Sequence, residues 1–110
     1  MKQREIWISD LNPVKGSEQR GIRPVVIISG NAMNDHLGIC IACPLSSVIK
    51  NYTGCTVLSK NETNGLDQDS EIITFQVRTI ARERLIRKMG EITVEQLDRV
   101  VKGLNEILEY

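Results

Sequence analysis

A short loop between two glycines carries the side chains best suited to chemistry in this chain. Residues 16–24 read Gly-Ser-Glu-Gln-Arg-Gly-Ile-Arg-Pro and lead directly into an apolar run. The loop therefore places Glu18 and Arg23 beside a segment typical of a buried strand, where a rigid sheet can hold binding or catalytic groups. Pro24 biases Arg23 towards an extended backbone. Because a guanidinium is a permanent cation that can hold a phosphate by two hydrogen bonds, the loop predicts an anionic substrate.

Glu18 and Arg23 allow two interpretations. They could form an ion pair that only fixes the loop, or they could act on a substrate, and the two roles are not exclusive. An exposed ion pair contributes little to stability and requires neither the neighbouring Gln19 nor the flanking glycines. The composition of the loop therefore favours a functional role.

Two hydroxyls follow another apolar segment. Ser46 and Ser47 come directly after residues 38–45, which read as a buried strand. Such hydroxyls can bind phosphate oxygens or take part in proton transfer. Serine after a strand usually only begins a turn, and the residues alone favour that simpler explanation.

A third polar group lies on a predicted strand over residues 71–79. Thr74, Gln76 and Arg78 alternate with apolar residues there, so the three polar side chains are expected to share one face. Gln and Arg can read bases through paired hydrogen bonds, and Phe75 could stack on a base if it is exposed. An ordinary solvated strand face is the commoner explanation.

The sequence predicts no metal site and no cofactor. Cys40 and Cys43 have the spacing of metal ligands, but no second Cys or His pair completes a tetrahedral site. We therefore expect two core cysteines. His36 has no evident partner and is expected on the surface, and there is no glycine-rich phosphate loop or carboxylate cluster.

The elements that would hold these residues are mostly strands. Alternating or continuous apolar runs predict strands over residues 5–9, 24–29, 38–45 (broken by Pro44), 55–59, 71–79 and 85–92. Residues 30–37 read as a short helical turn and 60–70 as a loop. Thr93 and Gln96 form a capping box that begins an amphipathic helix. Strands in series predict a mainly antiparallel sheet or partly open barrel with one closing helix.

Length and charge set the class of protein. At 110 residues the chain is expected to form a single domain over 1–110. The net charge of zero argues against a large non-specific nucleic-acid footprint. Three cysteines, an odd number, and no signal-like N-terminal run favour a reducing cytoplasm. No apolar stretch approaches the ~20 residues that span a bilayer, so no membrane association is expected.

The order of these motifs resembles the MazF/PemK-type endoribonuclease toxins of bacterial toxin–antitoxin systems. The resemblance covers nearly the whole chain and includes the closing helix. The segments that carry it are Ile-Trp-Ile-Ser-Asp-Leu-Asn-Pro at 6–13, the run from Gly16 to Ser29, Cys-Pro-Leu-Ser-Ser at 43–47 and Phe-Gln-Val-Arg-Thr-Ile at 75–80.

The resemblance implies an SH3-like small barrel, a homodimer and metal-independent cleavage of single-stranded RNA at short sequences. In such toxins the ribose 2′-hydroxyl attacks the adjacent phosphorus and leaves a 2′,3′-cyclic phosphate and a 5′-hydroxyl. A cognate antitoxin with an acidic, disordered tail is the implied protein partner.

The family's essential residues fall on particular positions of this chain. Its arginine falls on Arg23 and its threonine on Ser46, where serine keeps the hydroxyl but lacks the methyl group that restricts χ1. Reduced but retained activity is the expected consequence. Glu18 would accept the 2′-hydroxyl proton or orient Arg23. The residues assigned to substrate binding are Ser17, Gln19, Ser47, Gln76 and Arg78.

Two alternatives stay open at this stage. CcdB-type toxins use the same barrel to poison DNA gyrase and cut no RNA, but they are not expected to need the 16–24 loop. A catalytically weakened member that only binds RNA is also compatible with Ser46. Phe75 stands where many relatives carry an acid, so the base preference is not predicted.

Overall fold

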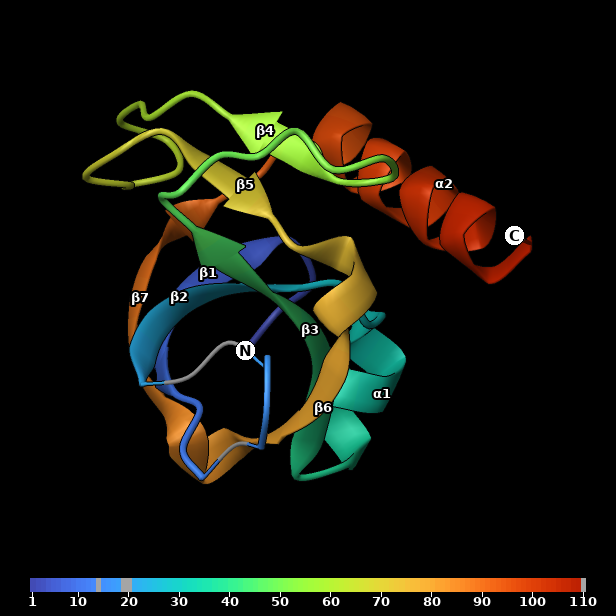
Figure 1. Ribbon diagram of the computed structural model, residues 1–110. Coiled ribbons are helices and arrows are strands. Elements are labelled where there is room, and N and C mark those ends of the chain that lie inside the picture. The colour runs from blue at the N-terminus through green and yellow to red at the C-terminus, as the bar shows by residue number, and fades with distance from the viewer. Residues whose placement is uncertain (14, 19–20, 110) are drawn as a thin grey trace.

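Antiparallel strands form a strongly curved sheet that wraps around the interior of the protein (Figure 1). The computed structural model describes residues 1–13, 15–18 and 21–109. Within these residues the strands follow the order β4-β5-β3-β2-β1-β7, and β6 also pairs with β3. The strands are β1 (Glu5–Asp10), β2 (Ile22–Ile27), β3 (Ile39–Ser46), β4 (Thr56–Leu58), β5 (Ser70–Ile72), β6 (Arg78–Ala81) and β7 (Leu85–Glu91).

Helices are few and lie at the margins of the sheet. They are α1 (Asn31–His36), the 3-10 turns η1 (Thr74–Gln76) and η2 (Arg82–Arg84), and the C-terminal α2 (Val94–Glu109). The predicted capping box begins α2: the Thr93 N–H donates to Gln96 Oε1 at 2.8 Å, and the Gln96 N–H donates to Thr93 Oγ1 at 3.0 Å. The predicted fold class, mainly β with a C-terminal helix, is confirmed. No helix in the described part of the chain has the length and apolar character needed to cross a membrane.

The interior contains two hydrophobic clusters on opposite sides of β2. Val26 packs in the first, which joins the sheet to α2 through Val100. Val25 and Ile27 pack in the second, inside the curve of the sheet. Each of these valine or isoleucine side chains contributes about 1.5–3 kcal/mol through burial. The prediction of a central strand buried on both faces is therefore confirmed.

The predicted strand over residues 71–79 is wrong in its middle. Leu45 faces Ile72 and Ala42 faces Arg78, so the two β3 residues 43–44 stand opposite the five residues 73–77. The extra residues form η1, in which Thr74 is fully buried while Phe75 is 45% exposed. Thr74 therefore does not share a face with Gln76 and Arg78, which are both partly exposed.

The reason for the irregularity lies across the ladder at Pro44. The sequence predicted a break at Pro44, but β3 runs through the proline to Ser46. Pro44 accepts a hydrogen bond from the Ile73 N–H at 2.9 Å but has no N–H to return. A regular ladder cannot continue past this point. The segment that pairs with β3 therefore leaves it at residues 73–77, where it forms η1, and pairs with β3 again as β6.

Candidate active site

Hydrogen bonds join the two ends of the loop between β1 and β2. The Leu11 N–H donates to the Gly21 carbonyl at 3.0 Å, and the Gly21 N–H donates to Asn12 Oδ1 at 3.2 Å. Arg84, which no sequence motif marked as part of the site, donates through Nη1 to the carbonyls of Asp10, at 3.2 Å, and Asn12. These bonds fix both ends of the loop to the sheet, so that it enters β2 directly before Arg23.

The loop glycines adopt backbone angles that other residues rarely take. Gly16 has φ of 59° and Gly21 has φ of 82°, in the left-handed region. The glycines are therefore required by the backbone of the loop itself. The predicted binding residue Gln19 lies outside the described residues.

Two residues predicted to bind substrate anchor this loop. Gln76 donates through Nε2 to the Ser17 carbonyl at 3.2 Å, and Arg78 donates through Nη1 to the Leu11 carbonyl at 3.4 Å. Both bonds join the η1–β6 segment to the loop, which lies about 60 residues earlier in the chain. Gln76 and Arg78 thus have a structural role whatever else they contact.

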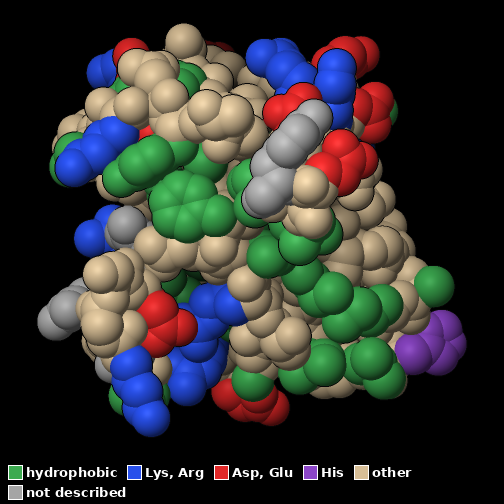
Figure 2. Space-filling model, turned by 45° about the vertical axis from the view of Figure 1, so that its right-hand side comes forward, with side chains coloured by type: hydrophobic (Ala, Val, Ile, Leu, Met, Phe, Trp, Pro, Cys, Tyr) green, Lys and Arg blue, Asp and Glu red, His purple; other side chains and the backbone are tan. Residues whose placement is uncertain are grey.

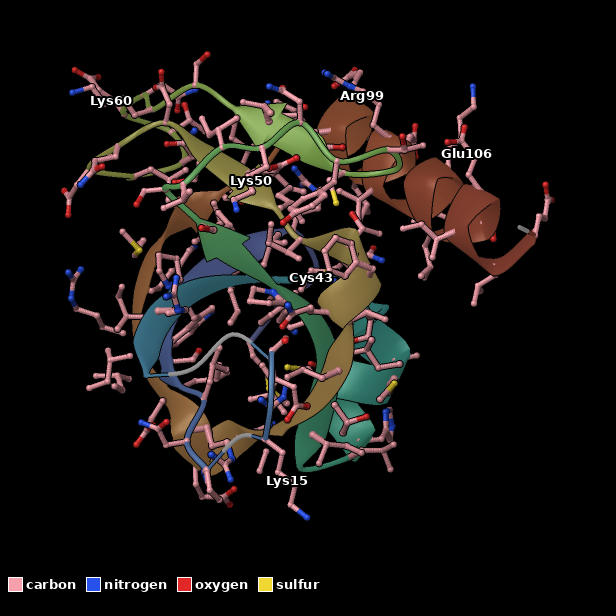
Figure 3. The ribbon with its side chains drawn as sticks, in the orientation of Figure 1. Lys15, Cys43, Lys50, Lys60, Arg99 and Glu106 are labelled. Carbon is pink, nitrogen blue, oxygen red and sulfur yellow. The ribbon has the colours of Figure 1, made fainter. Side chains whose placement is uncertain are left out.

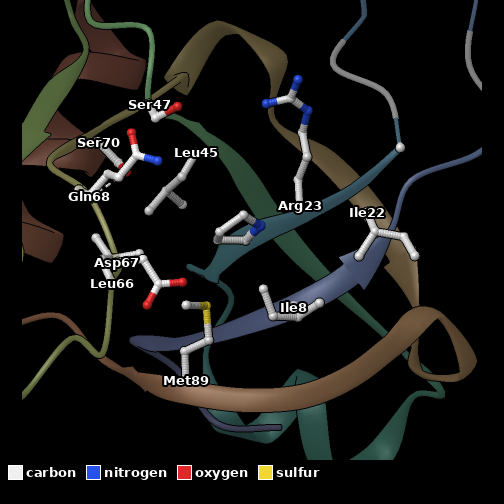
Figure 4. A pocket seen from close by; sticks show the side chains of 12 residues that line it. Ile8, Ile22, Arg23, Leu45, Ser47, Leu66, Asp67, Gln68, Ser70 and Met89 are labelled. Atoms are coloured by element: carbon white, nitrogen blue, oxygen red, sulfur yellow. Dashed lines mark hydrogen bonds between the residues drawn. The ribbon is translucent and has the colours of Figure 1, made fainter.

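Arg23 lies at a hollow of about 410 Å³ (Figure 4). In this view its guanidinium points upward, away from the apolar side chains that line the lower part of the hollow. Of the predicted site residues that the structure describes, only Arg23 and Ser47 line this hollow. Its other lining residues come from five strands, the end of the β1–β2 loop and the β4–β5 loop: Ile8, Gly21, Ile22, Pro24, Leu45, Leu66, Asp67, Gln68, Ser70 and Met89.

The β4–β5 loop was missed as part of the site. In the sequence its polar residues at 60–70 read only as a connection. The structure brings Asp67 and Gln68 to the hollow because β5 pairs with the end of β3, next to β2. No local signal in the sequence could place them there, since the pairing joins segments far apart in the chain.

Glu18 lines a different, smaller hollow of about 170 Å³ with Gln76 and Arg78. Its Oε1 accepts a hydrogen bond from the Lys15 N–H at 2.7 Å. Glu18 and Arg23 thus come from the same loop region but line separate hollows. Figure 2 shows a recess on one face of the molecule with Lys or Arg and Asp or Glu side chains below a hydrophobic group.

Ser46 ends β3 with its hydroxyl turned to the backbone. Ser46 is only 7% exposed, and its Oγ accepts a hydrogen bond from the Val48 N–H at 3.1 Å. Ser46 lines neither hollow, whereas the exposed Ser47 lines the one at Arg23. The turn that the sequence favoured for this pair is present, and a catalytic role of Ser46 stays a prediction.

A buried carboxylate that the sequence did not reveal holds the segment after Ser47. Glu71 is fully buried on β5, directly across the ladder from Ser46. Its Oε1 accepts the Lys50 N–H at 2.8 Å, and its Oε2 accepts the Tyr52 N–H at 2.8 Å. Glu71 is thus a positioning residue for the β3–β4 loop.

An exposed aromatic pair borders the smaller hollow. The Tyr52 and Phe75 rings meet edge to face, with centroids 5.0 Å apart and an interplanar angle of 88°. Both residues keep more than 40% of their surface exposed. Phe75 is therefore exposed, as stacking on a base requires, and Tyr52 fixes its orientation.

Cys40 and Cys43 belong to different core clusters, as expected for core cysteines. Figure 3 labels Cys43, which comes from β3. Burial raises the pKa of the Cys43 thiol to about 12 and also raises that of Cys40.

We expect iodoacetamide at pH 8 to alkylate the partly exposed Cys55 first and to reach Cys40 and Cys43 only on unfolding. Mass spectrometry of timed samples measures this, and early labelling of Cys43 would contradict it.

Sequence comparison adds independent evidence to this geometry. A family model described as PemK-like, MazF-like toxin of type II toxin–antitoxin systems matches residues 2–108. The chain belongs to this family. It is 33% identical over 109 residues to endoribonuclease MazF9 of Mycobacterium tuberculosis, covering 94% of this chain and 92% of that protein. It is 35% identical over 104 residues to the endoribonuclease toxin MazF of Escherichia coli K12, covering 94% and 88%.

Solved structures show the same fold. The structure of MazF from Deinococcus radiodurans superposes with a TM-score of 0.83 at 24% identity, covering 99% of this chain and 96% of that chain. A mycobacterial endoribonuclease in complex with its cognate antitoxin superposes with a TM-score of 0.81 at 17% identity, covering 99% and 95%. The sequence-based prediction of an endoribonuclease toxin with the MazF fold is confirmed by the family and by the names of its relatives.

Proposed function

We propose that this toxin cuts single-stranded RNA by attack of a ribose 2′-hydroxyl on the adjacent phosphorus, without a metal ion. The observation that carries the proposal is Arg23, a permanent cation at a hollow whose volume suits a nucleotide-sized ligand. The products would be a 2′,3′-cyclic phosphate and a 5′-hydroxyl. Since the substrate supplies its own nucleophile, no metal-activated water is needed.

Arg23 would act on the charge that develops during the reaction. As the phosphorus becomes five-coordinate, negative charge grows on its non-bridging oxygens, and a cation already in place stabilises this state more than the ground state. The adjacent Pro24 and the ladder pairing of Arg23 with Ser9 hold its backbone before substrate arrives. The guanidinium would also donate a hydrogen bond to the leaving 5′-oxygen, which takes up its proton from solvent.

The other predicted residues would bind or activate the RNA around this centre. Glu18 would accept the 2′-hydroxyl proton or orient the loop, and Ser46 would contribute its hydroxyl after release from its turn. Their positions in or beside two hollows favour an RNA strand that passes from one to the other. The proposed binding residues are Ser17, Gln19, Ser47, Gln76 and Arg78.

We further propose that chain 1–110 acts as one domain, as a cytoplasmic homodimer, and that a cognate antitoxin restrains it. The family description, a toxin of type II toxin–antitoxin systems, supports an antitoxin partner. Exposed basic residues at Arg82, Arg87 and Lys88 suit the acidic tail expected of such a partner.

Incubation of the purified protein with single-stranded RNA in excess EDTA tests the proposed reaction. We expect cleavage at discrete sites, with cyclic phosphate and 5′-hydroxyl ends identified by their resistance to direct ligation. Loss of cleavage in EDTA with recovery on adding Mg²⁺ would overturn the metal-independent mechanism. Inhibition of gyrase supercoiling without any RNA cleavage would instead support the gyrase-poisoning alternative.

A further inference from the structure

The hollow at Arg23 contains three polar side chains to which the proposed mechanism gives no role. One is Ser70, whose hydroxyl donates to the Gln68 carbonyl at 3.0 Å. Asp67 and Gln68 project into it from the β4–β5 loop, across from Arg23 (Figure 4). Neither the Asp67 carboxylate nor the Gln68 side-chain amide has a hydrogen-bond or ion-pair partner in the part of the chain that the structure describes. Both therefore remain available to a ligand.

The rest of the hollow suits a flat, partly apolar group. Leu45, Leu66 and Met89 line it with Ile8 and Pro24, so that aliphatic groups and a polarisable sulfur border the space. Such surfaces pack well against the face of an aromatic ring. If Arg23 holds the scissile phosphate, the hollow lies where one of the attached nucleosides must go.

The carboxylate indicates which base fits. An ionised carboxylate only accepts hydrogen bonds and has two oxygens side by side. Among the four RNA bases, only guanine presents two adjacent N–H donors, N1–H and the N2 amino group, on its Watson–Crick edge. Adenine and cytosine place a ring acceptor beside their amino group, and uracil places its single N–H between two carbonyls, so each would turn an acceptor towards the carboxylate.

We propose that this hollow is a guanine-selective base subsite next to the cleaved phosphate. Asp67 accepts hydrogen bonds from guanine N1–H and N2, and the Gln68 amide donates to O6. The apolar lining residues enclose the faces of the base. This inference rests on the proposed function, because it takes the Arg23 guanidinium as the phosphate-binding group.

Cleavage of a randomised RNA pool by the full-length protein tests the subsite. Sequencing of the cleaved ends should show guanine enriched at one fixed position beside the cut. Asp67→Asn replaces one acceptor with a donor, so we expect the preference for guanine at that position to fall by roughly 5- to 150-fold. Cleavage at other sites should continue, because Arg23 is unchanged.

Asp69→Asn provides the matched control. Asp69 lies on the same loop but outside the hollow, and its Oδ1 accepts the Lys60 N–H at 2.9 Å, a bond that the asparagine oxygen can keep. This variant should retain the wild-type base profile. A fixed position without guanine preference, or an Asp67→Asn profile identical to that of the wild type, would overturn the base subsite and leave the nuclease function standing.

A binding experiment separates the subsite from the reaction. The probes are thymine oligodeoxynucleotides with one central deoxyadenosine, deoxycytidine or deoxyguanosine, which lack the 2′-hydroxyl and cannot be cut. We expect the guanine probe to bind best, by a margin that Asp67→Asn removes. If the wild type cuts no RNA but keeps this preference, the proposed reaction fails and the subsite holds. Equal binding of all probes would overturn the subsite and favour a cationic side chain of a protein partner as its occupant.

Discussion

Replacement of Arg23 by alanine should lower the rate of RNA cleavage by about 10²–10³-fold or more and leave the fold intact. Among the described residues that line the hollow, Arg23 is the one cation, and alanine removes it together with the stabilisation of the five-coordinate phosphorus. The protein should still fold, because Arg23 lies at the start of β2, outside both hydrophobic clusters. The measurement is the single-turnover cleavage rate of a defined RNA, with circular dichroism to confirm the fold.

Two further variants make this test specific. Arg23→Lys keeps a positive charge but loses the planar fork that holds a phosphate by two hydrogen bonds, so an intermediate rate is expected. Arg87→Ala removes an exposed arginine of β7 that lines neither hollow, and it should change the rate little at moderate salt. A folded Arg23→Ala protein that cuts RNA at the normal rate would refute the role of this residue.

Local sequence patterns predicted most of the fold because local forces determine it. The capping box at Thr93 and the apolar run in the second half of β2 reflect helix capping and burial, and both features are confirmed. The failure at η1 has a different origin. Whether residues 73–77 stay in the ladder depends on Pro44, which lies opposite them and about 30 residues earlier in the chain.

The candidate site shows the same contrast between residues marked by local patterns and residues placed by long-range strand pairing. Arg23 was found from the sequence because the glycine loop, the arginine and the proline are adjacent. Asp67, Gln68 and Glu71 were not, because strand pairing brings them to the site from a distant loop and strand. Family resemblance could not supply them either, since it transfers only residues that match the family's motifs.

The second large effect is expected at Glu71, whose carboxylate is buried without a cation beside it. Neither of the ion pairs found among the described residues involves Glu71, so backbone N–H groups balance its charge. Hydrogen bonds to charged groups contribute about 1.5–3 kcal/mol each. Glu71→Ala leaves the Lys50 and Tyr52 donors unpaired, and we expect the free energy of unfolding in urea to fall by about 3 kcal/mol or more.

The same substitution should affect function at temperatures where the variant remains folded. The β3–β4 loop carries Ser47 at the Arg23 hollow and Tyr52 against Phe75, so loss of its anchor should slow cleavage as well. Glu71→Gln keeps one acceptor and should lie between wild type and alanine in both measurements. Glu62→Ala, at an exposed loop position, is the control and should change neither. If Glu71→Ala unfolded at the same urea concentration as the wild type, the loop would not depend on this carboxylate. A loss of stability without slower cleavage would limit Glu71 to a role in the fold.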